Sequence, residues 1–240
     1  MAVFASRQIV MKYPEKMLGD YAVGESVFLN VNGYPKEFIV VNHGNPDSTI
    51  YGSGCNGTWL LMKDVYTEKT FDSTSNDYKE SSIKKYLDGT TFSTNNTVLS
   101  LFDDNIQSIV KSAYIPYVSG GGKSGSVTTM KAKLFLLSAY EVGFTTSSSN
   151  KLYVDGSALE YFNGADNERR IAYYGGFAFE YWTRSPVNDN SAAVVRVSSD
   201  GSMFYSSTAT PYNDYGVRPA LILPSTAKFY SGINTFTGVS

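Results

Sequence analysis

Residues 180–224 read E-Y-W-T-R-S-P-V-N-D-N-S-A-A-V-V-R-V-S-S-D-G-S-M-F-Y-S-S-T-A-T-P-Y-N-D-Y-G-V-R-P-A-L-I-L-P, and their two ends have the composition of a buried framework. Tyr181–Pro186 carries a tryptophan and an arginine close to a proline, and Gly216–Leu223 closes with the apolar run A-L-I-L. Large aromatic and branched apolar side chains are commonly buried in folded proteins. We therefore predict two core strands, one at each end of this segment.

The sequence between these ends differs sharply in composition. Almost every residue is Asn, Asp, Ser, Thr, Tyr, Phe, Ala or Val. Antibody combining sites have a similar composition, because Tyr gives rigid amphipathic contact area while Ser and Asn give adaptable hydrogen bonds. The contrast favours a fixed scaffold that presents a surface able to vary, and an ordinary polar hairpin is the alternative.

Residue usage in this segment points the same way. From Arg184 to Pro224 there is no Lys, Glu, Gln or Trp, and Met203 is the one Met. Average usage would give roughly five or six such residues. An Asn codon randomised at its two adenines never yields Lys, Glu, Gln, Met or Trp, so the pattern is compatible with targeted diversification.

Local signals predict short elements along the rest of the chain. Asn32-Gly33 separates two β-rich runs and indicates a hairpin. Ser81 and Thr97 are placed to cap short helices, and 157–162 also favours a helix. Asp200-Gly201 indicates a second hairpin turn inside the variable segment.

Several motifs together resemble an uncharacterised domain family common in Firmicutes and their prophages. They are V-N-G-Y-P-K-E-F-I-V-V at 31–41, G-T-W-L-L-M-K-D-V-Y at 57–66, N-D-Y-K-E-S-S-I-K-K-Y-L at 76–87, A-K-L-F-L-L-S-A-Y-E-V-G at 132–143, W-T-R-S-P at 182–186 and G-V-R-P-A-L-I-L at 216–223. Members are similar to C-type-lectin-fold proteins diversified by retroelements, a class that includes the phage major tropism determinant.

The resemblance implies an α+β protein with a C-type-lectin-like fold, built from mixed β-sheets and hairpins with a few short helices. Residues 1–22 are expected to form an N-terminal arm or assembly segment. The domain is expected to cover 23–224, with its variable segment at about 187–215, and 225–240 to be a C-terminal tail. Formylglycine-generating enzymes share this fold, so the fold alone does not define a function.

The same resemblance implies a division of labour among the residues of 180–224. Four framework residues are expected to hold the shape: Trp182, Arg184, Val217 and Arg218. The residues expected to contact a ligand are Asn188, Asp189, Asn190, Ser191, Arg196, Ser198, Phe204, Tyr205, Ser206, Ser207, Thr208, Thr210, Tyr212, Asn213, Asp214 and Tyr215.

Charge and composition argue against some classes of partner. The net charge of −2 and the pI near 5.5 do not fit a nucleic-acid-binding surface, which needs clustered Lys and Arg. No window approaches the ~18 apolar residues of a membrane span, and the first residues do not resemble a signal peptide. Cys55 is the sole cysteine, which excludes an intramolecular disulfide.

Catalytic and metal-binding signals are weak. His43 is the single histidine, Cys55 lacks a basic neighbour in sequence, and the G-G-G-K-S run has Tyr117 where a phosphate loop requires glycine. Carboxylate clusters at Asp103-Asp104, and at Asp189 with Asp214, read as solvated loop charge. We therefore predict no enzyme activity and no cofactor. Asn188-Asp189-Asn190 and Asn213-Asp214 carry the hard oxygen ligands that calcium prefers, so a calcium site is the alternative.

These observations lead to the hypothesis of a diversified ligand-binding protein, either a phage receptor-binding or tail-associated protein or a surface-displayed binder. The expected ligand is a protein or glycan on a target cell, and the protein is expected to be a homo-oligomer, a trimer by analogy. It would reside in the virion, or in the bacterial cytoplasm before assembly. A virion decoration protein and an enzyme on the same fold are the alternatives.

Overall fold

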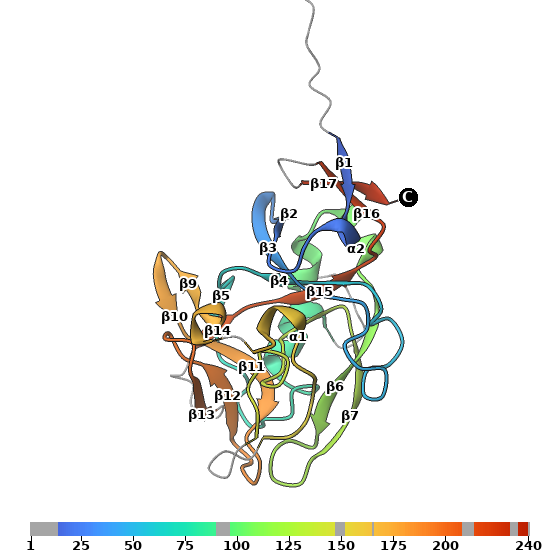
Figure 1. Ribbon diagram of the computed structural model, residues 1–240. Helices are drawn as coiled ribbons and strands as arrows, with labels where there is room; N and C mark the ends of the chain where they lie inside the picture. The colour runs from blue at the N-terminus through green and yellow to red at the C-terminus, as the bar shows by residue number, and fades with distance from the viewer. Residues whose placement is uncertain are drawn as a thin grey trace, which may run out of the picture.

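A computed structural model describes residues 14–89, 97–146, 152–164, 166–207, 214–230 and 235–239, and its strands form two sheets and two hairpins (Figure 1). Strand accounts for 41% of the structure and helix for 13%. The prediction of an α+β protein was therefore wrong, and the fold is mostly β. The cause is the length of the helices, because several expected helices amount to a single turn.

The larger sheet has eight strands in the order β1-β16-β17-β2-β3-β4-β15-β8. It is mixed, since β17 pairs with β2 in parallel and the other pairs are antiparallel. Its strands are β1 (Glu15–Met17), β2 (Ser26–Val31), β3 (Tyr34–His43), β4 (Thr58–Met62), β8 (Leu134–Phe135), β15 (Ala220–Leu223), β16 (Ala227–Tyr230) and β17 (Thr235–Val239).

The smaller sheet has five strands in the order β13-β12-β11-β14-β5 and lies at the lower left of Figure 1. Its strands are β5 (Thr67–Lys69), β11 (Tyr181–Pro186), β12 (Ala193–Val197), β13 (Met203–Ser207) and β14 (Tyr215–Val217). Two separate hairpins complete the strands, β6–β7 (Ala113–Ser119, Ser126–Ala132) and β9–β10 (Ala172–Tyr174, Phe177–Phe179).

The helices are short, and two of them begin where the capping signals predicted. The helix expected at 157–162 is only a 3₁₀ turn at Glu160–Phe162, without a side-chain cap. Helix α1 (Ser82–Asp88) starts at Ser81, whose side chain accepts a hydrogen bond from the Lys84 amide. Thr97 forms a capping box with Ser100 at a 3₁₀ turn. The other elements are α2 (Asp104–Ile109) and the 3₁₀ turns η1 (Leu18–Asp20), η2 (Val98–Leu101), η3 (Glu160–Phe162) and η4 (Asn167–Arg170).

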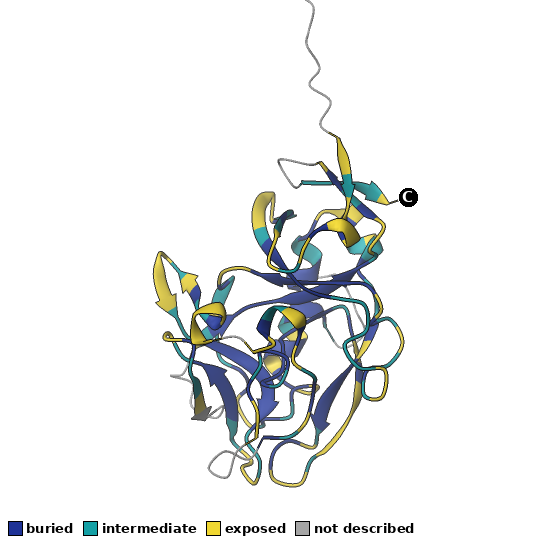
Figure 2. Ribbon diagram, viewed as in Figure 1, coloured by how far each residue is buried: buried dark blue, intermediate teal, exposed yellow. Residues whose placement is uncertain are grey.

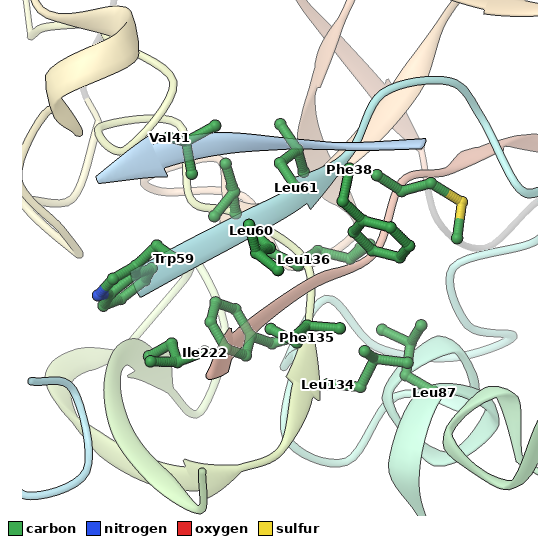
Figure 3. Close-up of a cluster of buried hydrophobic side chains, with 14 of the residues drawn as sticks. Phe38, Val41, Trp59, Leu60, Leu61, Leu87, Leu134, Phe135, Leu136 and Ile222 are labelled. Carbon is green, nitrogen blue, oxygen red and sulfur yellow. The ribbon is translucent and has the colours of Figure 1, made fainter. Parts of the chain in front are cut away.

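The main core lies on the eight-stranded sheet. Figure 3 shows Trp59, Leu60 and Leu61 of β4 gathered with Phe135 and Ile222 from neighbouring strands and with Leu87 of α1. Trp59 stacks edge-on against Phe135, with ring centroids 5.6 Å apart. Strand β4 is buried along its whole length, because it is an interior strand covered on both faces.

Both ends of the chain contribute to this sheet. The described part of the expected N-terminal arm forms β1 and η1, and β1 pairs with β16. The segment expected to be a tail forms β16 and β17, which are antiparallel partners. The strands of residues 14–22 and 225–239 are thus continuous with the sheet that includes β2–β4.

Candidate functional site

The frame of the candidate site is β11, which is buried at all six positions and lies in the middle of the five-stranded sheet (Figure 2). Its Arg184 is completely buried. The guanidinium donates to both carboxylate oxygens of Glu141 at 2.5 and 2.6 Å. It also donates to the carbonyl oxygens of Pro116, Leu136 and Asp155, so five hydrogen bonds match its five N–H groups.

This ionic contact extends into a buried polar cluster. Tyr51 donates its hydroxyl to Glu141 at 2.8 Å, and Ser185 donates to Asp155 Oδ2 at 2.7 Å. Burial disfavours a charged guanidinium, but the adjacent Glu141 carboxylate outweighs this and raises the pKa of Arg184. Burial raises the pKa of Asp155 to about 6, and its Oδ1 has no hydrogen-bond partner.

A second set of buried contacts involves Arg218, which joins the two sheets, and Trp182, which joins two strands of the smaller sheet. Arg218, between β14 and β15, donates to the Met62 carbonyl at 2.9 Å and to the Tyr181 hydroxyl at 3.0 Å. The Trp182 indole N–H donates to the Lys69 carbonyl at 2.9 Å. Val217 is also buried. All four residues assigned to the framework therefore lie in the interior, and each arginine has backbone or side-chain acceptors there.

One face of the five-stranded sheet carries a row of side chains that leads from this frame to the surface. Phe204 of β13 pairs with Arg196 of β12, and Arg196 pairs with Trp182 of β11. Tyr215 of β14 contacts the Trp182 ring edge-on at 4.8 Å. Because residues paired across a sheet share a face, the frame and the exposed edge are joined through Arg196.

Arg196 lies between two aromatic rings. Its guanidinium carbon is 4.6 Å from the Phe204 ring centroid and 4.4 Å from that of Tyr215. Glu180 forms an ion pair with the same guanidinium. Phe204 is 53% exposed, whereas Arg196 is 7% exposed. We call Phe204, Arg196, Tyr215 and Glu180 the aromatic–arginine cluster.

This arrangement gives Arg196 a supporting position. Its side chain was predicted to contact a ligand, yet the rings and Glu180 cover most of it. A cation held between two aromatic faces fixes both rings by electrostatic attraction. Glu180 was not predicted, and its position directly before the W-T-R-S-P strand is the one available signal.

The alternation of β13 separates two of the predicted aromatic anchors. Phe204 pairs with Arg196 and its neighbour Tyr205 pairs with Val195, so the two side chains point to opposite faces of the strand. Tyr205 is 36% exposed, and burial raises its pKa. Only Phe204 therefore shares a surface with Tyr215.

The polar loop between β11 and β12 has a fixed backbone. The Asn76 side chain donates to the carbonyl oxygens of Asn190 and Ala193, both at 2.8 Å. The Asp189 amide donates to the Gly122 carbonyl at 2.9 Å, and a Cβ at Gly122 would collide with the backbone of this loop. Asp189, Asn190 and Ser191 are nevertheless exposed, and Asn188 is half-buried. No sequence signal marked Asn76.

The remaining predicted contact residues are spread over other positions. Asp214 accepts a hydrogen bond from the Thr70 hydroxyl at 2.6 Å, and Ser198 lies 3.5 Å from a Glu180 carboxylate oxygen. Thr208, Thr210, Tyr212 and Asn213, together with the side chains of Ser206 and Ser207, lie outside the described residues. Within the described ranges there is no group of three or more His, Cys, Asp or Glu placed to hold a metal.

The residues considered for catalysis are engaged in structural contacts. His43 ends β3, and its ring nitrogens lie 3.1 Å from the Thr58 hydroxyl and 2.8 Å from the Tyr21 carbonyl oxygen. Cys55 is buried, and burial raises the pKa of its thiol to about 12, which leaves it protonated. Asp103 accepts a hydrogen bond from the side-chain amide of Asn30 at 2.9 Å.

None of the helices in the part of the chain that the structure describes has the length and apolarity needed to cross a bilayer.

Comparison with protein families identifies one match. Residues 56–225 match Domain of unknown function (DUF6273), and the chain therefore belongs to this family. The matched region runs from the loop before β4 to just beyond β15, so it includes the aromatic–arginine cluster and its frame. Neither the curated proteins nor the solved structures contain a match, and the expected C-type-lectin-like fold gains no support from them.

Proposed function

We propose that this member of the DUF6273 family is a ligand-binding protein whose contact surface includes the aromatic–arginine cluster and the exposed loop residues Asp189, Asn190 and Ser191. The observation that carries the proposal is the ring of Phe204, which is 53% exposed while Arg196 holds it from beneath. Exposed aromatic side chains with a fixed orientation supply much of the binding energy in protein interfaces. A pre-positioned ring also loses little conformational entropy on binding.

The separation of frame and surface supports diversification of this face. Arg184 and Trp182 make their hydrogen bonds to the backbone and to Glu141, and none of these bonds involves an exposed residue of 187–192. The backbone of that loop is held by Asn76 and Gly122, which lie outside the segment expected to vary, and by Asn190, whose side-chain oxygen accepts from the Ala192 and Ala193 amides. Exchanging the exposed side chains of Asp189 and Ser191 would therefore leave the frame intact. Within this proposal the protein is displayed on a phage particle or a cell surface, where many copies add avidity.

The direct test is binding to cells. Fluorescently labelled full-length protein would be incubated with a panel of bacterial strains, and bound fluorescence would be measured by flow cytometry. Phe204→Ala is expected to reduce binding at least tenfold, while the melting temperature stays within a few degrees. Tyr114→Ala removes an aromatic side chain of comparable exposure, 40%, from a different strand and is expected to bind like the original protein.

Two results would count against the proposal. One is unchanged binding by the Phe204→Ala protein, and the other is its unfolding, which would make the ring part of the frame. Sequencing the locus in sibling isolates gives an independent test of diversification. Substitutions concentrated in 187–215 at adenine positions would support it, and uniform drift along the gene would remove that support.

A further inference from the structure

A groove lies outside the segment expected to vary, where the eight-stranded sheet passes into the five-stranded sheet. One part, of about 300 Å³, has Phe28, Met62 and Val65 among its walls. The adjoining part, of about 280 Å³, is lined by Tyr34, Tyr66 and Tyr86 among others. Both parts are lined by Lys36 and Tyr66 and are therefore adjacent, and together we call them the tyrosine groove. Each part is near the lower size limit of small-molecule sites.

The three tyrosines come from different elements that meet at this junction. Tyr34 opens β3 and is 68% exposed, Tyr66 lies between β4 and β5, and Tyr86 belongs to α1. The Tyr66 amide donates to the Val217 carbonyl at 2.8 Å, which fixes its backbone. The Lys69 ammonium lies 4.7 Å from the Tyr86 ring centroid. The groove is therefore built from elements that the core already holds in place.

The phenol groups of Tyr66 and Tyr86 remain neutral in this setting. Burial raises the pKa of Tyr66, and burial followed by the neighbouring Tyr66 raises that of Tyr86. A neutral phenol both donates and accepts hydrogen bonds, and its ring offers an apolar face. The groove thus combines flat apolar surfaces with hydroxyl groups at their edges.

The charges around the groove balance. Its lining includes Lys36 and Lys63 as cations and Glu37 and Asp64 as anions. Glu37 and Lys63 pair with each other, with Nζ–O distances of 2.9 and 3.0 Å. A site for phosphate or another anion requires an excess of cationic donors. Among the described residues, two cations and two carboxylates balance in the first part, and Lys36 is the one charged residue that lines the adjoining part. Neither described lining has a cluster of cationic donors, which favours an uncharged ligand.

From this combination we propose that the tyrosine groove binds a neutral oligosaccharide. The C–H faces of pyranose rings pack on aromatic rings, and their hydroxyl groups pair with short polar side chains such as Asn32 and Thr67, which line the same part of the groove. Aromatic-lined grooves also bind proline-rich peptides, so such a peptide is the alternative occupant that the experiment tests. The proposal is independent of the aromatic–arginine cluster.

The groove also crosses the boundary of the family match. Tyr34 and Lys36 precede residue 56, whereas Tyr66 and Tyr86 lie within the matched region. One wall of the groove therefore comes from the β2–β3 hairpin, which precedes the matched region.

The experiment uses full-length protein and a printed array of neutral and anionic glycans, followed by saturation-transfer NMR with the neutral oligosaccharide that binds best. Tyr34→Ala is expected to weaken binding about tenfold, because one stacking surface is lost. Tyr66→Phe, which keeps the ring and removes the hydroxyl, is expected to weaken binding several-fold. Raising the salt concentration is expected to leave the affinity unchanged, since no ion pair to the ligand is involved.

Matched controls separate this site from the aromatic–arginine cluster. Tyr114→Ala and Phe204→Ala both lie outside the groove and are expected to bind the oligosaccharide like the original protein. The proposal is overturned if no neutral glycan binds, if Tyr34→Ala binds normally, or if a proline-rich peptide library is retained by the groove instead. Loss of cell binding in Phe204→Ala with intact oligosaccharide binding would show two independent sites.

Discussion

The inner strand β11 and the edge strand β13 belong to the same five-stranded sheet, yet their side chains are held in opposite ways. Arg184 on β11 is fully buried and makes five hydrogen bonds. Phe204 on β13 is 53% exposed, and its ring makes a cation–π contact with Arg196. A strand in the middle of a sheet is fixed by neighbours on every side, whereas an edge strand leaves one side open for a partner.

This difference explains how one sheet can have a rigid inner strand and an edge strand that tolerates side-chain substitutions. Stability should depend on the contacts of β11 and hardly at all on the exposed side chains of β13. Four substitutions or conditions test that expectation, ordered by the size of the effect on the free energy of unfolding.

Glu141→Ala should have the largest effect. It leaves the Arg184 charge buried without its carboxylate partner and removes the acceptor of the Tyr51 hydroxyl. Removing one partner of a buried ion pair typically costs about 3–5 kcal/mol of unfolding free energy. Urea denaturation of the variant would measure this loss. Glu37→Ala, which breaks the exposed pair with Lys63, is the control and should cost below about 1 kcal/mol. Equal losses for both variants would show that β11 is no more rigid than the surface.

The buried carboxyl of Asp155 should make the frame sensitive to pH. Burial is the main cause that raises its folded-state pKa to about 6, and the charge of Glu141 adds to it, while the Arg184 charge and the Ser185 hydrogen bond lower it. The folded protein therefore holds this proton more tightly than the unfolded chain does. The resulting stability is complete below the ordinary pKa near 3.8 and is lost as pH rises through about 6.

The free energy of unfolding should fall by about 2–3 kcal/mol between pH 4 and pH 7 because of Asp155. Asp155→Asn keeps a neutral side chain of the same shape and should flatten this part of the profile. The measurement is urea denaturation of both proteins across that pH range. Parallel profiles for the two proteins would mean that the carboxyl does not retain its proton in the folded state.

Arg196→Ala should have an intermediate effect, because this residue links the frame to the edge. Its loss removes the cation between Phe204 and Tyr215 and the ion pair with Glu180. We expect a loss of about 1 kcal/mol together with weaker cell binding, because the Phe204 ring is no longer held. Arg169→Ala, which removes a cation near the exposed side of Tyr161, should change neither quantity. A loss of unfolding free energy as large as that of Glu141→Ala would show that Arg196 is part of the buried frame and does not merely support the edge.

Phe204→Ser should have the smallest effect on stability, within about 0.5 kcal/mol, because the ring is largely solvated already. Phe71→Ala provides the contrast, since Phe71 is fully buried against Trp182 and should cost about 3–5 kcal/mol. Thermal unfolding followed by circular dichroism compares the two. A large loss for Phe204→Ser would contradict the division between β11 and β13.

Part of this architecture could be predicted from local sequence. Asn32-Gly33 and Asp200-Gly201 form the predicted turns, with φ of 54°, 76° and, at Gly201, 79°. Ser81 and Thr97 cap the predicted helical turns. These signals depend on residues a few positions apart, so they can be recognised in the sequence before the fold is known. The overall class was predicted incorrectly, because capping signals locate a helix without fixing its length.

The sequence by itself determined the hairpin turns, the helix starts at Ser81 and Thr97 and the burial of the W-T-R-S-P and A-L-I-L strands, because turn chemistry and hydrophobicity are local properties. Only the tertiary structure decided that Arg184 meets Glu141, 43 positions away, that Phe204 and Tyr205 face opposite ways, and that Tyr34, Tyr66 and Tyr86 line one groove. These relations depend on strand order and register. Packing of the whole chain sets both, and no short stretch of sequence specifies them.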